Sequence, residues 1–205
     1  MQDSKNHWES VYKSKNPSEV SWYQPHLKKS LAFISKTSIP KNASIVDVGG
    51  GASTLVEDLL HQQYEHITVV DLSSEALKKA KDSLGKLADQ VTWIEADITK
   101  VSFLENSSDL WHDRAAFHFL INPDDRKRYI SVLLEGLKPN GHLIIATFSL
   151  QGPERCSGLD VVRYDPQKLQ IELGDNFELM GSEPESHKTP FGTVQNFIYC
   201  WFRKK

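Results

Sequence analysis

Cysteine is scarce in this sequence, and long apolar runs are missing. Cys156 and Cys200 are the only two cysteines among 205 residues, which gives no disulfide framework and no spacing typical of a zinc site. No apolar run approaches the roughly 18 residues that span a bilayer, and Met1–Ser10 is too polar for the core of a signal peptide. The sequence therefore predicts a cytoplasmic protein with no membrane partner.

Excess positive charge is also missing. The 24 basic and 27 acidic residues give a net charge of −3, whereas proteins that bind nucleic acid through its phosphates are usually basic. The eight histidines form no pair at i, i+4 spacing and have no cysteine partner. We therefore expect neither a nucleic-acid partner nor a metal site.

The length fits a single domain, residues 1–205. Short apolar runs alternate with helix-like segments through its middle, which is typical of an α/β sheet. The expected strands are 44–48, 67–71, 91–95, 109–112 and 142–148, followed by 177–183 and 193–203. Because only a turn region separates the last two, they are expected to be antiparallel neighbours. The pattern predicts a mostly parallel sheet that ends in an antiparallel hairpin.

Two helices have clear start signals. One is expected over 74–86, with a serine as its cap. The other begins at Asn122-Pro123, a capping residue followed by the residue favoured at the first helical position. A turn over 138–141 is expected to end it. Its buried face is expected to consist of Ile130, Leu133, Leu134 and Leu137.

A glycine turn and a spaced acid indicate a cofactor site. Gly49, Gly50 and Gly51 follow the strand 44–48, and Asp71 ends the next strand 20 positions after Gly51. Glycines that open a helix, with an acid about 20 residues later, are typical of sites for nucleoside-containing cofactors. Glycine lets the backbone approach the ligand, the helix N-terminus offers free N–H groups, and the acid accepts hydrogen bonds from ribose hydroxyls.

The glycine pattern distinguishes between two kinds of cofactor. A dinucleotide fingerprint counted from Gly49 places Thr54 where glycine or alanine is usual. Asp47-x-Gly-x-Gly instead resembles the first motif of the class I S-adenosylmethionine-dependent methyltransferases, with Ser53 in place of their usual third glycine. The resemblance extends over about 44–202. It implies a Rossmann-like α/β fold with strand order 3-2-1-4-5-7-6, helices on both faces of the sheet, and S-adenosylmethionine as cofactor.

The resemblance also implies where each part of the cofactor lies. The glycine loop would pack against the methionine part, and Asp47 would hold its amino group directly or through water. Asp71 would bind the ribose hydroxyls, and Asp97 would accept from the adenine amino group, with Leu72 and Ile98 beside the ring. Each motif has a structural alternative: a tight turn for the glycine loop, a helix cap for Asp71 and a turn residue for Asp97.

Polar residues follow the fourth expected strand, at the end of the sheet where ligands of open α/β folds bind. The run 111–118, Trp-His-Asp-Arg-Ala-Ala-Phe-His, resembles a subset of the family that includes small bacterial enzymes and protein-lysine methyltransferases. It differs from the Asn/Asp-Pro-Pro-Tyr/Phe motif of enzymes that methylate DNA bases. His112 and Asp113 are the candidate catalytic residues. The structural alternative is an Asp113–Arg114 ion pair, with His118 packed in the core.

Two further segments are expected near the mouth of the site. Residues 1–40 form an aromatic-rich segment, expected to be helical and to cover the cofactor, with Trp22 on the cofactor and Tyr23 on the substrate. Aromatic faces attract the cationic sulfonium; the alternative is that these rings pack a helix onto the sheet. The loop 151–164 is expected to contact the substrate, for instance a carboxylate. Its candidates are Arg155, Arg163 and Tyr164.

The sequence as a whole predicts a methyltransferase with a Rossmann-like core over 44–205. By resemblance, a methyl group would pass from S-adenosylmethionine to a protein lysine or a small-molecule acceptor by in-line displacement. A nicotinamide-dependent oxidoreductase is the alternative enzyme, and a non-catalytic protein that binds the cofactor is the alternative outside the enzymes. The sequence does not decide between a monomer and a homodimer.

Overall fold

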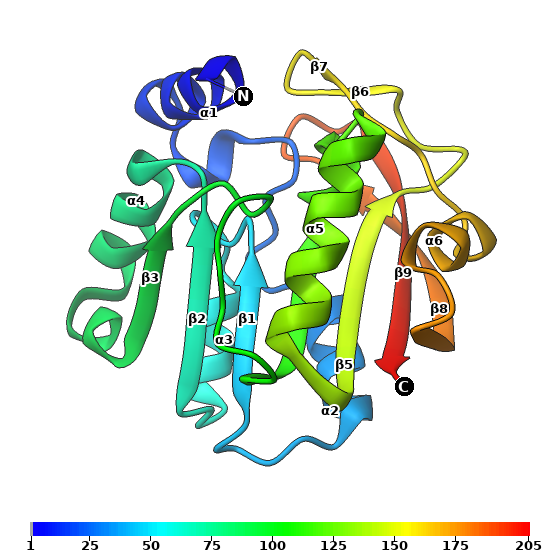
Figure 1. Cartoon of the computed structure of the whole chain (residues 1–205). Helices are drawn as coiled ribbons and strands as arrows, with labels where there is room; N and C mark the ends of the chain where they lie inside the picture. The colour runs from blue at the N-terminus through cyan, green and yellow to red at the C-terminus, as the bar shows by residue number, and fades with distance from the viewer. Residues whose placement is uncertain (1) are drawn as a thin grey trace.

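A seven-stranded sheet runs through the centre of the molecule, with helices on both of its faces (Figure 1). The computed structural model describes residues 2–205, with side chains from Ser4 onward, so Met1 of the expected N-terminal segment lies outside it. The strands are β1 Ser44–Val48, β2 His66–Asp71, β3 Val91–Glu95, β4 Ser108–Arg114, β5 Leu137–Phe148, β8 Phe177–Lys188 and β9 Val194–Lys204.

The sheet has the order β3-β2-β1-β4-β5-β9-β8. Neighbouring strands are parallel from β3 to β5 and antiparallel from β5 through β9 to β8. When only these strands are numbered along the chain, the order becomes 3-2-1-4-5-7-6. The topology implied by the resemblance, including the terminal hairpin, is therefore confirmed.

Six α-helices accompany the sheet within residues 2–205. They are α1 Gln2–Ser14, α2 Lys28–Thr37, α3 Leu55–His61, α4 Ser74–Leu84, α5 Pro123–Gly136 and α6 Pro166–Leu173. Two short strands, β6 Arg155–Cys156 and β7 Leu159–Asp160, form a separate small hairpin. None of the described helices has the length and apolar character needed to cross a membrane.

Successive residues of the central strands fill two separate cores. In β1, Ile45 packs in the core that α2 and α3 cover, whereas Val46 packs in the core that α5 and α6 cover. Ile144 and Ile145 of β5 divide in the same way. Because side chains alternate across a strand, an unbroken apolar run supplies both faces of a buried parallel sheet.

The predicted buried face of α5 is confirmed for Leu133 and Leu137 but not for Ile130 and Leu134. Tyr129, Val132, Leu133 and Gly136 are buried, whereas Ile130 and Leu134 lie at the side and are only partly covered. The Tyr129 hydroxyl donates to Asp113 at 2.8 Å and accepts from the Trp111 indole at 3.0 Å. This buried polar anchor fixes the rotation of the helix, and a tyrosine is not counted in a pattern of aliphatic residues.

β4 and β5 are both longer than predicted. β4 continues past His112 to Arg114. β5 begins at Leu137, so the expected turn over 138–141 lies inside the strand as an irregularity: Leu137 pairs with Ser108, and His142 already pairs with Leu110. The turn residues are thus accommodated as a bulge between two paired parts of β5, which is a common solution in sheets.

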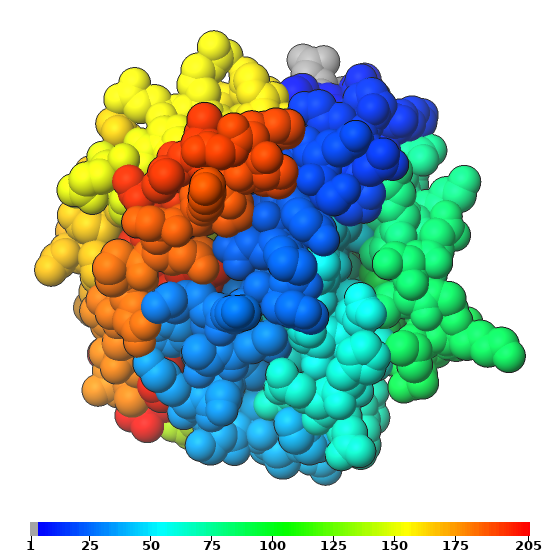
Figure 2. All heavy atoms as spheres, turned by 180° about the vertical axis from the view of Figure 1, so that it is seen from behind, coloured from blue at the N-terminus to red at the C-terminus, as the bar shows by residue number. Residues whose placement is uncertain are grey.

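The β8–β9 hairpin lies beside the N-terminal part of the chain, as Figure 2 shows from behind. Glu183 of β8 accepts hydrogen bonds from Lys29 and Lys36 of α2, each at 2.6 Å. Farther along β8, the His187 ring donates to the Ser21 carbonyl at 2.8 Å. These contacts explain why β8 continues five residues beyond the predicted end, because its polar half binds the segment that precedes the sheet.

Candidate functional site

A cavity of about 450 Å³ lies at the carboxyl ends of β1, β2 and β4. This volume is within the range of small-molecule sites. Several residues singled out in the sequence meet there. The lining includes Trp8, Tyr12, Trp22, Gly49, Asp71, Leu72, Asp97, Ile98, Arg114 and Arg155. A second, much smaller void of about 30 Å³ adjoins it, with Tyr23, Asp47, Gly49, Gly50, His112 and Arg114 in its wall.

The glycine loop is pressed against neighbouring side chains. Gly49 has a φ of +68°, a conformation that favours glycine. A Cβ atom on Gly50 would lie 2.2 Å from Asp47 Oδ2 and 3.2 Å from a Val69 methyl group. The loop therefore lies as close to Asp47 as its backbone allows, and a larger residue at position 50 would displace that carboxylate.

Asp71 joins the glycine loop to the start of α4. Its Oδ2 accepts from the Gly51 N–H at 2.9 Å, and its Oδ1 accepts from the Ser73 N–H at 2.8 Å. Ser73, not Asp71, caps α4, because its hydroxyl accepts from the Ala76 N–H. Burial raises the pKa of Asp71 to about 6. Each carboxylate oxygen keeps a lone pair for a further donor on the cavity side.

Asp97 both forms a turn and lines the cavity. Its Oδ1 accepts from the Thr99 N–H at 3.0 Å and from the Thr99 hydroxyl at 2.7 Å. Its Oδ2 lies 3.2 Å from the Lys100 ammonium. Burial alone would raise the pKa of Asp97, but the bonds from Thr99 and the charge of Lys100 hold it below its usual value. The carboxylate is thus ionised and fixed beside Ile98.

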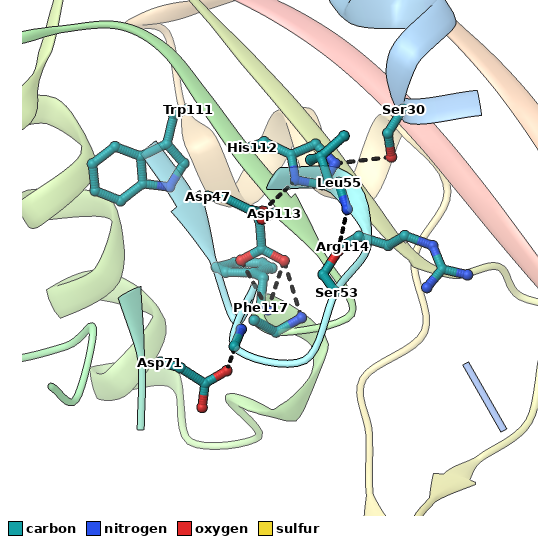
Figure 3. Close-up of polar contacts among 12 residues, drawn as sticks. Ser30, Asp47, Ser53, Leu55, Asp71, Trp111, His112, Asp113, Arg114 and Phe117 are labelled. Atoms are coloured by element: carbon teal, nitrogen blue, oxygen red, sulfur yellow. Dashed lines mark hydrogen bonds and ion pairs between the residues drawn. The ribbon is translucent and has the colours of Figure 1, made fainter. Parts of the chain in front are cut away.

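Asp47 and His112 form a buried pair beneath the glycine loop (Figure 3). Asp47 Oδ1 lies 2.7 Å from His112 Nδ1, and His112 Nε2 lies 2.9 Å from the Ser30 hydroxyl. Asp47 Oδ2 is buried and has no hydrogen-bond partner among the described residues. An unpaired buried acceptor costs about 1–3 kcal/mol, more when charged. Asp47 lines the smaller void, and a ligand N–H bound there would satisfy the free oxygen.

Asp113 faces α5 and not the cavity. Its Oδ1 accepts from the Ala116 N–H at 3.0 Å, and its Oδ2 accepts from the Phe117 N–H at 3.1 Å and from the Tyr129 hydroxyl. The side chain is fully buried, and burial raises its pKa to about 6. Both oxygens of Asp113 therefore bind donors of the protein itself, and in this arrangement the side chain does not make the expected direct contact with a substrate.

The alternative ion pair between Asp113 and Arg114 does not form among the described contacts. The two side chains leave β4 on opposite sides, as Figure 3 shows. His118 packs in the core as that alternative held: its Nδ1 accepts from the Phe148 N–H at 3.2 Å. Burial lowers the pKa of His118 to about 3, so the ring is neutral.

Arg114 lines the cavity, although the sequence did not predict it as a ligand contact. Its Nε donates to the Tyr199 hydroxyl at 3.0 Å, and its Nη1 donates to the Trp22 carbonyl at 3.0 Å. The strand was predicted to end at His112. Continued by two residues, the alternation of a strand places His112 and Arg114 on one side and Asp113 on the other. That signal was present in the sequence.

Four aromatic rings form one wall of the cavity. Trp8 of α1 contacts Phe119 and Trp22, with ring centroids 5.0 and 5.7 Å apart, and Tyr12 contacts Trp22 at 6.3 Å. Glu9 of α1 accepts from the first N–H groups of α4, at 2.7 Å from the Ser74 nitrogen. The helix α1 thus covers the cavity and is held at α4, and Tyr23 lies at the smaller void.

The loop 151–164 contributes one of its three predicted residues to the cavity. Arg155 lines it, with its Nε 3.0 Å from Asp160 Oδ1. Arg163 instead holds the loop together, because it donates to the carbonyls of Leu150 and Gly152. Tyr164 is buried, and neither it nor Arg163 lines the two voids described above.

Comparison with known proteins shows that this chain is similar to methyltransferases. A family model described as "Methyltransferase domain" matches residues 45–141. The human "EEF1A lysine methyltransferase 2" is 23% identical over 207 residues, which cover 92% of this chain and 80% of the relative. The "Ubiquinone/menaquinone biosynthesis C-methyltransferase UbiE" of Roseobacter denitrificans is 25% identical over 137 residues, 64% of this chain and 54% of the relative.

The fold has a solved counterpart with ligands bound. The Burkholderia thailandensis 1,6-didemethyltoxoflavin-N1-methyltransferase, crystallised with 1,6-didemethyltoxoflavin and S-adenosylhomocysteine, superimposes with a TM-score of 0.73. It is 18% identical, and the match covers 99% of this chain and 84% of that one. The similar proteins named here are methyltransferases, and none of them supports the alternative of a nicotinamide-dependent oxidoreductase.

Proposed function

Since the chain belongs to the class I S-adenosylmethionine-dependent methyltransferases, we propose that its cavity holds the cofactor and admits a methyl acceptor beside it. The observation that carries this proposal is the unpaired Asp47 Oδ2 under the glycine loop, next to the smaller void. A buried carboxylate oxygen without a donor fits a ligand ammonium, such as the amino group of the methionine part.

The other carboxylates fit the remaining parts of the cofactor. Asp71 keeps free lone pairs at the cavity and would accept from the ribose hydroxyls. Asp97, Leu72 and Ile98 lie together in the lining and would hold the adenine. Glycine at positions 49, 50 and 51 lets the loop lie close to Ala116, Asp47 and Asp71, because a Cβ there would come within 2.9, 2.2 and 2.7 Å of those side chains.

The chain's contribution to the reaction is chiefly to position the reactants and exclude water. When bound, S-adenosylmethionine supplies an electrophilic methyl group with a thioether as leaving group. The wall of Trp8, Tyr12 and Trp22 shields the cavity, and aromatic faces stabilise a positive charge. Holding two reactants in line lowers the barrier by converting a bimolecular step into a unimolecular one.

We propose positioning roles for the two residues first expected to be catalytic. His112 holds Asp47 in place through Nδ1 and is itself held by Ser30. Asp113 binds the chain at Ala116 and Phe117, directly after β4, and so shapes the end of the strand. Substitution of either residue should alter the affinity for the cofactor. It should have a smaller effect on how the rate of methyl transfer depends on the basicity of the acceptor.

The acceptor is proposed to be a protein lysine or a small molecule, the two classes named for the relatives above. Of the residues expected at the acceptor, Tyr23 and Arg155 border the two voids. The cytosol is the proposed location, because Cys156 and Cys200 are both free and buried.

Calorimetric titration with S-adenosylhomocysteine, S-adenosylmethionine and NADH tests the proposal. We expect micromolar binding of the two adenosyl ligands and none of NADH. Gly50→Ala should weaken binding at least about tenfold, because its Cβ would displace the Asp47 carboxylate.

Gly181→Ala is the matched control, since nothing lies within 4 Å of a Cβ built there. Circular dichroism on heating shows whether each variant is folded. Binding of NADH alone, or unchanged affinity in folded Gly50→Ala, would overturn the assignment of this site.

A further inference from the structure

Arg114 is held rigidly where the cavity and the smaller void meet. Two of its nitrogens donate, to the Tyr199 hydroxyl and the Trp22 carbonyl, and its guanidinium lies over the Phe197 ring at 4.7 Å. The side chain is only 5% exposed, yet it lines both voids. In Figure 3 its side chain extends away from the Asp47–His112 pair.

The third nitrogen of this guanidinium has no hydrogen bond. Nη2 is buried without a partner among the described residues. Glu185 Oε2 is its nearest counter-charge at 3.9 Å, too far for a hydrogen bond, and this carboxylate already accepts from Gln24 at 3.3 Å. The fold thus fixes two sides of the guanidinium and leaves the third to be satisfied by a ligand.

Charges of both signs line the site. Asp71 and Asp97 line the cavity where the cofactor's adenosine is proposed to bind. Arg114 lies at the boundary with the void that the methionine part is proposed to enter, and therefore near the reacting atoms. A lysine ammonium brought there would face a fixed guanidinium, whereas a carboxylate or another delocalised oxyanion would receive charge-assisted hydrogen bonds.

We infer that Arg114 binds an oxyanion of the methyl acceptor, and that the acceptor is a small anionic molecule and not a protein lysine. The inference rests on the proposed function, because it concerns the acceptor side of the same cavity. Arg114 then orients the acceptor through Nη2, with Tyr199 and Trp22 keeping the guanidinium in position.

The test compares three probes of one size and different charge. Benzoate, benzamide and benzylamine are titrated into protein already saturated with S-adenosylhomocysteine, with tryptophan fluorescence as the readout because Trp22 lines both voids. We expect benzoate to bind about tenfold more tightly than benzamide, and benzylamine most weakly. Equal binding of the three probes, or a preference for benzylamine, would overturn the inference.

Two substitutions locate the effect. Arg114→Met should remove the preference for benzoate, whereas Arg203→Met, which removes an arginine paired with Glu178 on the surface, should keep it. Glu185→Gln should strengthen benzoate binding several-fold, because it removes the competing carboxylate while Arg114 stays. If Arg114→Met does not fold, Glu185→Gln decides, and an unchanged affinity there would contradict the inference.

The design separates this inference from the proposed function. If S-adenosylhomocysteine itself does not bind, the cofactor assignment fails and the acceptor argument fails with it. If it binds and benzoate does not, only the role of Arg114 is refuted. Loss of the benzoate preference in Arg155→Met but not in Arg114→Met would transfer the anion site to Arg155 at the rim and refute the present assignment.

Discussion

Cofactor affinity should depend on pH through Asp71. Burial raises the pKa of this carboxyl to about 6, and the negative charges of Asp47 and Glu9 add to the effect. Ribose hydroxyls donate to the ionised form, so a bound cofactor holds Asp71 ionised while the free protein takes up a proton below pH 6. Affinity should therefore be constant above about pH 7 and should fall as the pH decreases through 6.

The size of the effect follows from the same value. If only the ionised form binds, the affinity falls by a factor of 1 + 10^(6 − pH), which is about 11-fold at pH 5. Asp71→Asn removes the titration. It also leaves a single carbonyl oxygen where Gly51 and Ser73 both donate, so we expect weaker binding at every pH and a loss of stability of about 1–3 kcal/mol.

The assay is calorimetric titration with S-adenosylhomocysteine from pH 8 to pH 5. This ligand has no sulfonium, and its own groups do not titrate in that range. Asp113→Asn is the control for the pH dependence: its affinity should be lower at every pH, but the fall through pH 6 should remain, because the pKa of Asp113 is also raised to about 6 while its side chain faces α5. A flat profile in the parent protein, or a flat profile in Asp113→Asn alone, would show that Asp71 does not govern binding.

Two further predictions concern stability and the helix over the cavity. Burial raises the pKa of Asp113 above its unfolded value, so its contribution to stability is greatest below about pH 4 and falls by about 3 kcal/mol as the pH rises through 6. When the free energy of unfolding is measured by chemical denaturation from pH 4 to pH 7, it should decrease less steeply with pH in Asp113→Asn than in the parent protein. Glu9→Ala removes the acceptor for the Ser74 and Glu75 N–H groups and should weaken S-adenosylhomocysteine binding about fivefold, with Asn6→Ala on the same helix as the unaffected control. Equal affinities in these two α1 variants would show that α1 does not cover a bound cofactor.

The central strands and the glycine loop were predictable because local signals specify them, whereas the strand order was implied only by the family resemblance. Short apolar runs fix strands such as 44–48 and 91–95, which match β1 and β3. The glycines after β1 and the acid at the end of β2 are read from spacing alone, and parallel strands bring their carboxyl ends to one edge of the sheet. Such features depend on the residue itself and its immediate neighbours.

The rotation of α5 was not predictable from the same signals. The aliphatic pattern selects Ile130 and Leu134, but the buried face contains Tyr129 and Gly136 instead. Gly136 packs so closely that a Cβ there would lie 3.2 Å from Phe103 and 3.3 Å from Trp111, which leaves no room for a larger residue. Which side of a helix is buried is decided by partners such as the carboxylate of Asp113, which lie far away in the sequence.

The alternation of side chains along β4 determines where the charged groups of the site lie. His112 and Arg114 leave one side of the strand, so one binds the Asp47 carboxylate at 2.7 Å and the other reaches Tyr199 of β9. Asp113 leaves the other side and accepts hydrogen bonds from the chain that follows it. A cationic cofactor would thus meet the carboxylates at the ends of β1 and β2, while an anionic acceptor would meet Arg114 at the end of β4. The two reactants would be oriented by opposite charges on adjacent strands, and a slip of one residue in β4 would reverse that order.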